Sequence, residues 1–455
     1  MITIKTDSRK VRKGDTFVAL RGISRDGHDF IEKAIELGAC KIVAEEGSYS
    51  VSTEIVPDTR IYLEEELKKN YNKQIEEMNL IGITGTNGKT TTAWFIYQAL
   101  NQIGSKTAYI GTVGFYIEEK IYDLPNTTVD LCDMYDLLIE AYDAGCSNIV
   151  MEVSSHALAM GRIKTLTFDA AIFTNLTQDH LDFHKTMDEY AKAKQILFRS
   201  LKKDGLAFVN VDDKYKNYFM LPENKTITYG FGESDFKVES YQMSNKGTTF
   251  SYISNQEESI IQTNLIGRYN VYNSIATIAF LETIGIKKDK IASIFETIKA
   301  PSGRIETILY QSNSIVIDYA HSPDAIENII TAMKEVTNGH IYVVFGCTGD
   351  RDRTKRPIMA NLVSDLSDYF IITNDDPHFE DPNQIVADIT NGLVSDHYEV
   401  CLDRKEAIRK GITLLGENDT LLILGKGHEE SMIIGRDKIP FNDHKVVTDI
   451  LNEQN

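Results

Sequence analysis

The sequence predicts an α/β protein of three domains with a mainly parallel, doubly wound central sheet, and three observations support this fold class. The chain of 455 residues is well above the ~100–200 residues usual for one domain. Short apolar runs alternate with segments of helical period along most of its length. The pattern changes to short alternating segments at residues 235–265, and a plausible hinge lies at 301–305. We therefore expect domains at residues 1–78, 79–300 and 301–455.

Composition and charge narrow the function classes. The formal net charge of −19 is the opposite of the basic field that a nucleic-acid surface needs, so no nucleic-acid partner is expected. The five cysteines form no C-x-x-C pair, which suggests neither a zinc ribbon nor a disulfide framework. The N-terminus lacks a signal pattern, and no apolar run approaches the ~18–20 residues of a membrane span. We expect a cytoplasmic protein with no membrane partner.

The first 78 residues have the pattern of a small α/β module. Its expected elements are a strand near 16–20, a helix at 30–37 and a strand at 41–44. The charged run at 64–69 is typical of the solvated face of a helix. Ser8 and Ser24 lie in turns, where they are either ordinary turn residues or contacts to a polar ligand.

The central and C-terminal parts alternate strands and helices. The expected central elements are strands at 80–83, 107–113, 149–153 and 170–175, helices at 131–144, 269–283 and 290–299, and antiparallel hairpins within 235–265. The expected C-terminal strands are at 315–318, 341–345, 369–373 and 421–424, with helices between them. No G-x-G-x-x-G follows these last strands, so we expect a Rossmann-like domain without a dinucleotide fingerprint.

A Gly-rich loop at the end of the first central strand is the strongest functional signal. Gly85 and Gly88 let backbone N–H groups converge on a phosphate, Lys89 supplies a charge for the outer phosphates, and the Thr90 hydroxyl suits Mg²⁺. The loop departs from G-x-x-x-x-G-K-[ST], because Ile83 stands where the first glycine belongs. The expected ligand is ATP with Mg²⁺.

Two later strand ends carry further candidates. Glu152 ends a buried strand, where a doubly wound sheet presents catalytic groups, and is a candidate ligand for Mg²⁺. His180 and His184 have a spacing compatible with zinc but no third ligand, so a single cation contact through His180 is favoured. On periodicity alone, Lys194 is a solvated lysine on an amphipathic helix.

An ordered set of motifs runs through essentially the whole chain and resembles the Mur ligase family of peptidoglycan synthesis. Within that family it is most similar to the ligases that add the third amino acid. The motifs are Asp7-Ser-Arg9, Gly85-Thr-Asn-Gly-Lys-Thr-Thr91, Glu152-Val-Ser-Ser-His156, Asn175-Leu-Thr-Gln-Asp-His180, Ala193-Lys-Gln-Ile-Leu-Phe198, Ser302-Gly-Arg304, Asp318-Tyr-Ala-His321, Gly349-Asp-Arg-Asp352 and Gly425-Lys-Gly-His-Glu429.

The resemblance implies roles for individual residues. It implies ATP contacts at Gly85, Thr86, Asn87, Gly88, Lys89, Thr90, Thr91, Asn270, Arg304, Asp318 and His321. It implies metal ligands at Thr90, Glu152, His180 and Lys194, the last carbamylated by CO₂, and catalytic roles for Lys89, Glu152, His180 and Lys194. It implies contacts to the UDP-linked substrate at Ser8, Ser24, Thr127, Thr128, Ser154 and Arg162. Carbamylation needs a neutral amine, which a desolvated lysine provides because burial lowers its pKa.

The activity that the resemblance implies is ATP-dependent ligation of a diamino acid to the D-glutamate of UDP-N-acetylmuramoyl-L-alanyl-D-glutamate. The carboxylate would first be activated as an acyl phosphate, and the protein would act as a monomer on small-molecule substrates. The alternatives are a sister ligase, either the D-alanyl-D-alanine-adding enzyme or folylpolyglutamate synthetase. A P-loop switch that binds ATP without ligation is an alternative from another class.

One stretch departs from the family pattern. Family members that use meso-diaminopimelate read Asp-Asn-Pro-Arg there, and this chain reads Asp375-Asp-Pro-His378. A histidine cannot form the bidentate pair that arginine forms with a carboxylate, and Asp376 adds a negative charge suited to an ammonium group. L-lysine is therefore expected as the amino acid, with meso-diaminopimelate as the alternative if Arg351 supplies a cation. Glu429 is the expected partner of the amine, and Gly425 belongs to the same motif.

Overall fold

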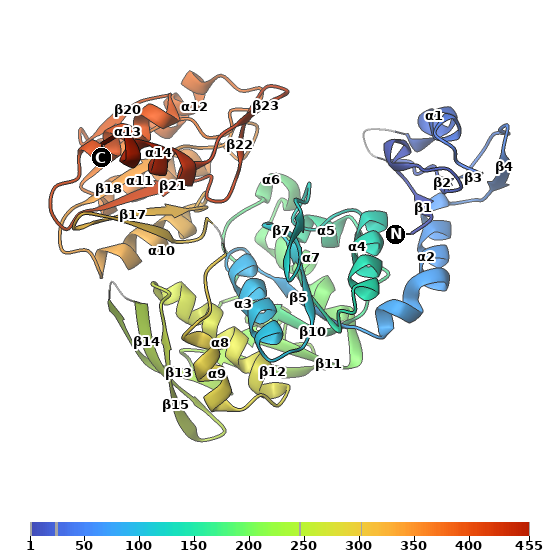
Figure 1. Cartoon of the computed structure of the whole chain (residues 1–455), viewed down its shortest axis with the longest axis horizontal. Coiled ribbons are helices and arrows are strands. Elements are labelled where there is room, and N and C mark those ends of the chain that lie inside the picture. The colour runs from blue at the N-terminus through green and yellow to red at the C-terminus, as the bar shows by residue number, and fades with distance from the viewer. Residues whose placement is uncertain (1, 23–25, 245–246, 302, 455) are drawn as a thin grey trace. The chain divides into compact units, whose positions relative to one another are not determined.

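The computed structural model describes residues 2–22, 26–244, 247–301 and 303–454 (Figure 1). The chain forms two compact units, each assembled from several segments. Unit 1 comprises Met1–Gly82, Leu100–Ala171 and Ile196–Gly205, and unit 2 comprises Ile83–Ala99, Ile172–Gln195 and Leu206–Asn455. In the described part of the chain, the strands form sheets of four, eleven, six and two strands. The predicted α/β class is confirmed.

The N-terminal module contains a small parallel sheet and several helical segments. Its strands, in sheet order, are β1 (Ile4–Lys5), β2 (Thr16–Val18), β3 (Lys41–Ala44) and β4 (Ser52–Ile55). The helical segments are η1 (Ser8–Lys10), η2 (Gly27–Phe30), α1 (Ile31–Glu36) and α2 (Thr59–Glu76). Phe17 and Ile42 pack against Ile31 and Ala34 of α1 in one apolar core. The Asp58 side chain starts α2 by accepting hydrogen bonds from two backbone N–H groups.

The eleven-stranded sheet has the order β15-β14-β13-β12-β11-β10-β5-β9-β6-β7-β8. Its strands are β5 (Asn79–Thr84), β6 (Thr107–Gly111), β7 (Gly114–Ile117), β8 (Glu119–Tyr122), β9 (Asn148–Glu152), β10 (Phe168–Phe173), β11 (Leu201–Asn210), β12 (Lys225–Gly230), β13 (Phe236–Ser244), β14 (Gly247–Ser254) and β15 (Glu257–Thr263). The associated helices are α3 (Lys89–Gln102), α4 (Leu131–Asp143), α5 (Ser155–Ala159), α6 (Leu181–His184), α7 (Met187–Arg199), α8 (Arg268–Thr283) and α9 (Lys288–Phe295), with η3 (Lys216–Tyr218).

The sequence signals account for this pattern of strands. Strands β6 and β9 pair in parallel, as do β11 with β12 and β12 with β13. The predicted change of pattern is confirmed, because β13, β14 and β15 pair antiparallel. Asn255 and Gln256 between β14 and β15 have φ of 51° and 65°, and two such residues form the type I′ turn that suits a tight hairpin.

The C-terminal sheet is buried on both faces. Its order is β16-β17-β21-β18-β19-β20, with strands β16 (Glu306–Tyr310), β17 (Asn313–Asp318), β18 (Ile341–Phe345), β19 (Tyr369–Ile372), β20 (Tyr398–Val400) and β21 (Thr420–Leu424). The helices are α10 (Pro323–Lys334), α11 (Lys355–Leu366), α12 (Pro382–Ile389), α13 (Arg404–Thr413) and α14 (Asp443–Gln454), and β22 (Ser431–Ile434) pairs with β23 (Asp437–Pro440). Val316 packs in one core with residues of α10, α11 and α12, while Ile315 and Ile317 pack in another with residues of α13 and α14. This alternation is that of a doubly wound sheet.

The carboxyl ends of the parallel strands gather the polar segments of this region. Asp318 ends β17, residues 346–352 follow β18, residues 373–380 follow β19, and Gly425 follows β21. In open α/β sheets this edge is where ligands bind.

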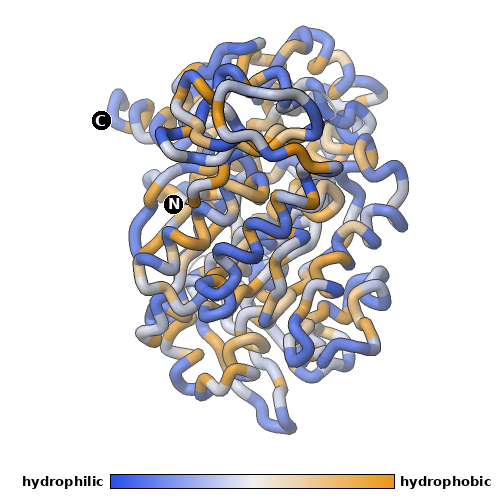
Figure 2. The backbone as a smooth tube through the Cα atoms, turned by 90° about the vertical axis from the view of Figure 1, so that its right-hand side faces the viewer, coloured by the Kyte–Doolittle hydropathy of each residue, from blue (hydrophilic) through white to orange (hydrophobic). Residues whose placement is uncertain are grey.

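Apolar and polar residues are interspersed along the whole backbone (Figure 2). Among the described residues, no helix is long and apolar enough to cross a membrane.

A fully buried ion pair joins two helices of the C-terminal region. Arg404 donates to both carboxylate oxygens of Asp443 at 2.8 and 2.7 Å, and both side chains have no exposed surface. Arg404 also donates to the carbonyl oxygens of Asn374 and Leu424, at the ends of β19 and β21. The pair therefore fixes two of the strand ends that carry polar segments.

Asp443→Asn should lower the free energy of unfolding by about 3–5 kcal/mol, because it leaves the Arg404 charge buried without a counter-ion. Urea unfolding followed by circular dichroism measures the change. Glu453→Gln is the control, since its partner Arg409 is partly exposed, and this variant should keep the wild-type midpoint. Equal midpoints for the two variants would contradict the role of the buried pair.

Candidate active site

The Gly-rich loop between β5 and α3 in unit 2 is shaped for close approach to a ligand. A Cβ atom at Gly85 would lie 1.9 Å from the Thr174 hydroxyl oxygen, and one at Gly88 would lie 2.5 Å from the Asn273 side-chain oxygen. Gly88 also has φ of +81°, which side-chain-bearing residues rarely adopt. Thr90 and Thr91 at the start of α3 are buried. The loop fits a phosphate cradle at a helix N-terminus.

Two lysines converge on one carbonyl oxygen of this loop. Lys89 Nζ donates to the carbonyls of Gly85 and Thr86 at 3.0 and 2.7 Å, and Lys194 Nζ donates to Gly85 at 2.7 Å. The expectation from periodicity that Lys194 is solvated is wrong, because this residue is only 1% exposed. Burial, and after it the Lys89 charge, lower the pKa of Lys194 well below its ordinary value. A fraction of neutral amine is thereby favoured on Lys194.

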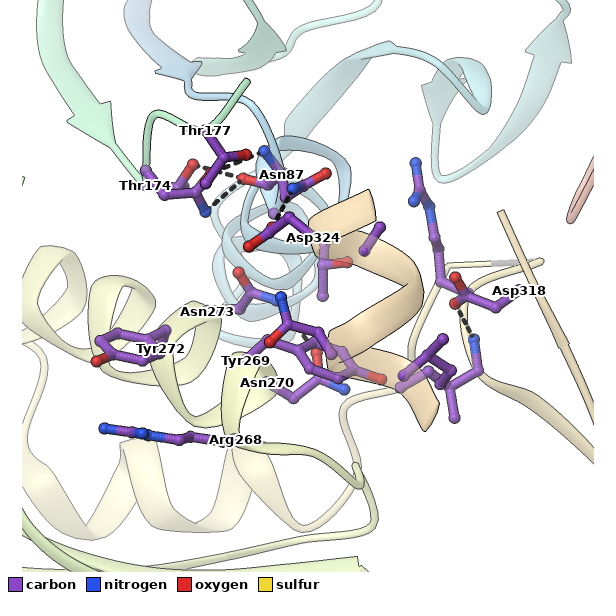
Figure 3. Close-up of a pocket in the computed structure, with 18 of the residues that line it drawn as sticks. Asn87, Thr174, Thr177, Arg268, Tyr269, Asn270, Tyr272, Asn273, Asp318 and Asp324 are labelled. Atoms are coloured by element: carbon purple, nitrogen blue, oxygen red, sulfur yellow. Dashed lines mark hydrogen bonds between the residues drawn. The ribbon is translucent and has the colours of Figure 1, made fainter. Parts of the chain in front are cut away.

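A cavity of about 290 Å³ adjoins the loop and has the size of a small-molecule site (Figure 3). Residues of the loop, of α8 and of the C-terminal region line it, including the predicted Asn87, Gly88, Thr91, Asn270, Arg304 and Asp318. Tyr269 Oη and Arg304 Nε are buried and, in the described structure, have no hydrogen-bond partner. Buried polar atoms of this kind are costly unless a ligand or water satisfies them. The cavity therefore fits a polar ligand such as a nucleotide.

Side chains of α8 connect the cavity to the loop. Asn273 accepts a hydrogen bond from the Thr92 hydroxyl at 3.2 Å and donates to Asn270 at 3.1 Å. Asn87 of the loop donates to the Asp324 carboxylate on α10 at 2.5 Å. Asn270 is thus held within a chain of amide contacts, and Asp324 ties α10 to the loop.

Charged groups from two parts of unit 2 meet around Asp179. Burial would raise the pKa of Asp179, but His180, then Lys355 and His321, outweigh it and lower the pKa. Burial, with the Lys355 charge in the same direction, lowers the pKa of His321 to about 4, so its imidazole is neutral at pH 7. His180 itself has φ of 55° and lies 3.4 Å from the Asp179 carboxylate. Lys355 donates to the His321 carbonyl at 3.0 Å.

In unit 1, the predicted Glu152 is completely buried and held by donors from β6 and the turn after it. Its Oε1 atom accepts from Tyr109 Oη at 2.5 Å and from the Thr112 backbone at 2.8 Å, and Oε2 accepts from the Thr112 hydroxyl at 3.2 Å. Such donors orient a carboxylate, which is how metal ligands are positioned in proteins.

The predicted contacts to the UDP-linked substrate largely gather around Glu152. Thr127 lies 3.1 Å from the Thr112 hydroxyl, and Thr128 donates to the Glu152 carbonyl at 2.8 Å. Thr128 also accepts from the Ser154 backbone, and Arg162 donates to the Thr128 carbonyl at 2.9 Å. Ser154 begins α5 by accepting from Ala157. Of the two remaining residues, Ser8 is buried in η1 of the N-terminal module, and Ser24 lies outside the described residues.

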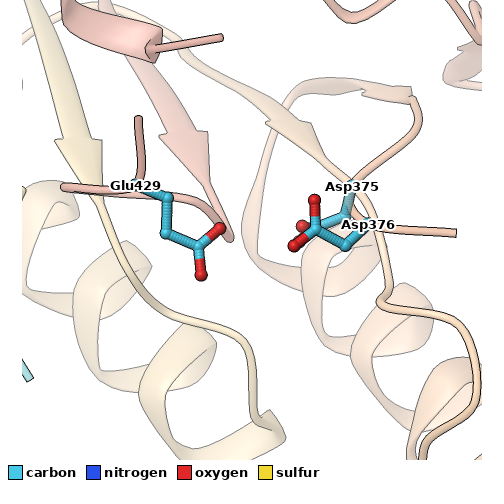
Figure 4. A group of neighbouring side chains, drawn as sticks. All are labelled: Asp375, Asp376 and Glu429. Carbon is cyan, nitrogen blue, oxygen red and sulfur yellow. The ribbon is translucent and has the colours of Figure 1, made fainter. Parts of the chain in front are cut away.

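A second polar cluster lies at the carboxyl ends of β19 and β21 (Figure 4). The carboxylates of Asp375, Asp376 and Glu429 surround Lys426, whose Nζ lies 3.7, 2.8 and 2.7 Å from them. Asp376 therefore pairs with a lysine of the chain itself. The sequence had predicted that its negative charge would instead suit the ammonium group of a substrate. Burial raises the pKa of Glu429 to about 7. A Cβ atom at Gly425 would lie 2.6 Å from the Asp375 carboxylate, so this position has room for glycine alone.

The segment that carries His378 is fixed mainly by backbone contacts. The His378 backbone donates to Ile433 at 3.1 Å and accepts from Gly435 at 2.6 Å. Gly349 and Phe379 hydrogen-bond across to residues 376 and 350, so the turn holding the exposed Arg351 packs on this segment. Arg351 and His378 thus belong to neighbouring loops.

Some residues of these clusters did not stand out in the sequence. Lys426 lies inside the Gly425–Glu429 motif, but only the two end residues of that motif were predicted to belong to the site. Asp179 likewise lies inside the Asn175–His180 motif, of which only His180 was predicted to act. Tyr109, Asp324 and Lys355 lie outside the motifs, and tertiary packing alone places them beside the predicted residues.

Comparisons with known proteins agree with these motifs. Three family models match in order: "Mur ligase family, catalytic domain" over residues 2–84, "Mur ligase middle domain" over 83–281 and "Mur ligase, glutamate ligase domain" over 303–427. The UDP-N-acetylmuramoyl-L-alanyl-D-glutamate–2,6-diaminopimelate ligase 1 of Clostridium acetobutylicum is 38% identical and covers 98% of this chain and 94% of its own length. The 2,6-diaminopimelate ligase of Aquifex aeolicus is 40% identical, with 98% and 93% covered.

Solved structures show the same fold. A UDP-N-acetylmuramoyl-L-alanyl-D-glutamate–2,6-diaminopimelate ligase matches with a TM-score of 0.69 at 31% identity, over 99% of this chain and 94% of that one. The MurF ligase of Thermotoga maritima, solved in complex with ADP, matches with a TM-score of 0.71 at 19% identity, over 99% and 96% of the two chains. At that identity the second match concerns the fold alone.

Gly88→Ala should weaken ATP binding by about tenfold or more, because the added Cβ meets Asn273 and pushes the phosphate loop out of shape. Isothermal titration calorimetry with ATP and Mg²⁺ measures the affinity. Gly104→Ala is a matched control: Gly104 has the same φ of +81°, and nothing lies within 4 Å of its added Cβ. Equal ATP affinities of the two variants would contradict the assignment of the loop.

Proposed function

The chain belongs to the Mur ligase family, and from that premise we propose that it joins a diamino acid to the D-glutamate of UDP-N-acetylmuramoyl-L-alanyl-D-glutamate. It is an ATP-dependent ligase of peptidoglycan precursor synthesis. The main support for this choice of substrates is that relatives named for this reaction are 38–40% identical over nearly the whole chain. The sister MurF ligase and a folylpolyglutamate synthase are 19% and 16% identical, so their likeness supports only a common fold.

Of the two candidate amino acids, we propose 2,6-diaminopimelate. The names of the relatives favour it, and they do not support the preference for L-lysine expected from His378. The packing of the 349–352 turn on the His378 segment supports Arg351 as the cation for the distal carboxylate. Glu429, at the open side of its cluster, would then face the amine.

The first chemical step activates a poor acylating agent. A D-glutamyl carboxylate oxygen bonds to the γ-phosphorus of ATP as the bond to the bridging oxygen breaks, giving an acyl phosphate and ADP. The loop N–H groups and Lys89 hold the phosphates, and Asn270, Arg304 and Asp318 line the nucleotide cavity. Thr90, Glu152 and His180 would hold Mg²⁺, which neutralises phosphate charge when bound. The protein's main contribution is to align two anions that repel each other.

The second step forms the amide. The neutral amine of the diamino acid attacks the acyl carbon, the C–N bond forms, phosphate leaves and the nitrogen releases a proton. Thr127, Thr128, Ser154 and Arg162 would hold the muramoyl-dipeptide, together with Ser8 and Ser24 at the UDP end. On this proposal, residues 1–78 bind the UDP end, 79–300 bind ATP and 301–455 bring the amino acid. Excluding water protects the acyl phosphate.

Lys194 is proposed to act as a carbamate. Its buried amine, with a lowered pKa, provides the uncharged nucleophile that reacts with CO₂. In that reaction the neutral Nζ atom forms a bond to the carbon of CO₂ and loses a proton, so the group that now bonds the Gly85 carbonyl would become an anion suited to Mg²⁺. The same lysine would then support phosphate chemistry instead of competing with Lys89 for one carbonyl.

The test of the proposed function is phosphate release by the purified protein with ATP, Mg²⁺, bicarbonate and the UDP-muramoyl-dipeptide against a panel of amino acids. meso-Diaminopimelate should give a higher kcat/KM than L-lysine. Arg351→Gln should lower kcat/KM for meso-diaminopimelate about 10- to 100-fold and change that for L-lysine little, because only the former has a distal carboxylate. Preference for L-lysine would overturn the choice of amino acid, and no ADP with any diamino acid would overturn the reaction.

Lys194→Ala should lower ligation by about 100-fold or more, and added formate or acetate should restore part of it by supplying the missing carboxylate. Lys192→Ala is the matched control on the same helix, since Lys192 is exposed and pairs with Asp188. The coupled release of ADP measures both variants. Full activity of unrescued Lys194→Ala would rule out the carbamate.

A further inference from the structure

Lys426 is an ammonium enclosed by three carboxylates, and its place in the reaction is unassigned. Its side chain has no exposed surface, and those of Asp375 and Asp376 are 4% and 10% exposed. Glu429 is the member that reaches solvent, with 30% of its side chain exposed. Burial would lower the pKa of Lys426, but the three carboxylates outweigh it and raise the pKa. Lys426 therefore stays charged inside the cluster.

One of the two inner carboxylates, that of Asp376, is also anchored independently of Lys426. Asp376 also accepts from the Ile433 backbone at 2.9 Å, which ties it to β22. Asp375 lies against Gly425, where a Cβ would come within 2.6 Å of its carboxylate. The carboxylates of Asp375 and Asp376 lie 3.7 and 2.8 Å from the Lys426 ammonium, and the ammonium in turn donates to Glu429 Oε2 at 2.7 Å.

Charge decides what the cluster can bind. Three carboxylates against one ammonium leave an excess of negative charge when all are ionised, and that excess suits a second ammonium. Such a group can approach only where the cluster is open, which is at Glu429. Without Lys426, three carboxylates would share a mostly buried site, and mutual repulsion together with desolvation would keep Glu429 protonated.

We propose that Lys426 is a positioning residue for amino-acid selection: it holds the Glu429 carboxylate ionised and aimed at the amine of the incoming diamino acid. This inference rests on the proposed function and adds to it a residue that acts through Glu429. It also gives Asp376 a role as the anchor of Lys426 in place of the direct substrate contact expected from the sequence.

The proposal predicts a pH signature. Burial raises the pKa of Glu429 to about 7, and Lys426 lowers it from what it would otherwise be. The charged and titratable groups that face Glu429 are Lys426, Asp375, Asp376, Tyr319 and Arg404. Removing the ammonium raises the pKa of Glu429 further, so the ionised form needed to bind an amine exists only at higher pH. In a variant without this ammonium, the KM for the diamino acid should fall as pH rises. This fall should occur at higher pH than in the wild type.

The experiment compares Lys426→Met with the charge-balanced double variant Lys426→Met/Asp376→Asn. At pH 7 both should raise KM for the diamino acid about 10- to 100-fold, the loss expected for a charge-assisted hydrogen bond, and leave KM for ATP and for the UDP-muramoyl-dipeptide within about twofold. In the single variant, the pH range over which KM for the diamino acid falls should also shift to higher pH. Lys438→Met, at an exposed lysine of β23, is the control and should behave as wild type.

The double variant keeps the test decisive if the single variant does not fold, because it removes the unbalanced carboxylate together with the lysine. Wild-type KM and pH dependence in a folded Lys426→Met or double variant would overturn the role of Lys426 while leaving the proposed function intact. Equal rises in KM for all three substrates would show a merely structural role and overturn it as well. Wild-type protein that ligates no diamino acid would overturn both proposals.

Discussion

The carbonyl oxygen of Gly85 receives hydrogen bonds from two lysine side chains, and the arrangement of the phosphate site depends on this contact. Two cationic groups on one acceptor repel each other, and burial of Lys194 strengthens the effect because little water screens it. Burial of the Lys194 ammonium is the larger cause of its lowered pKa, and this repulsion adds to it. Because the net charge of −19 opposes the binding of anions, Lys89 and the backbone N–H groups of the loop must supply local positive charge at the phosphate site.

The parallel sheets explain why residues far apart in the sequence share a site. In the C-terminal region, Asp318 ends one strand, and Asp375 and Gly425 each come after another strand at the same edge. In unit 1, Glu152 is the last residue of β9. It is held by donors from β6, the neighbouring strand in the sheet, and from the turn after β6. Short polar loops on rigid strands can place donors and acceptors closely while the apolar strands supply the core.

Most of the fold could be predicted from the sequence, because strand and helix periods are local. The strand at Ile341–Phe345 and the antiparallel hairpins before α8 are found where the patterns placed them. The residues of the site were predicted from motifs. Prediction from local sequence patterns failed for residues whose environment is set by tertiary burial. The pattern of α7 made Lys194 a solvated residue, since amphipathic spacing does not reveal that a loop from another strand covers it. Likewise the pairing of Asp376 with Lys426 needs two strand ends that lie 50 residues apart in the chain.

The His378 segment has a consequence for how this enzyme class diversifies. Its course is set by hydrogen bonds of the backbone to Ile433 and Gly435, and the side chain of His378 contributes to none of these bonds. The residue has φ of 50°, which histidine, asparagine and aspartate tolerate better than most. Because backbone bonds set the shape of this loop, the side chain can be exchanged at small cost in stability among residue types that tolerate a positive φ. Preference among building blocks of the bacterial wall can therefore drift by single substitutions, while the ligation machinery stays under its own constraints.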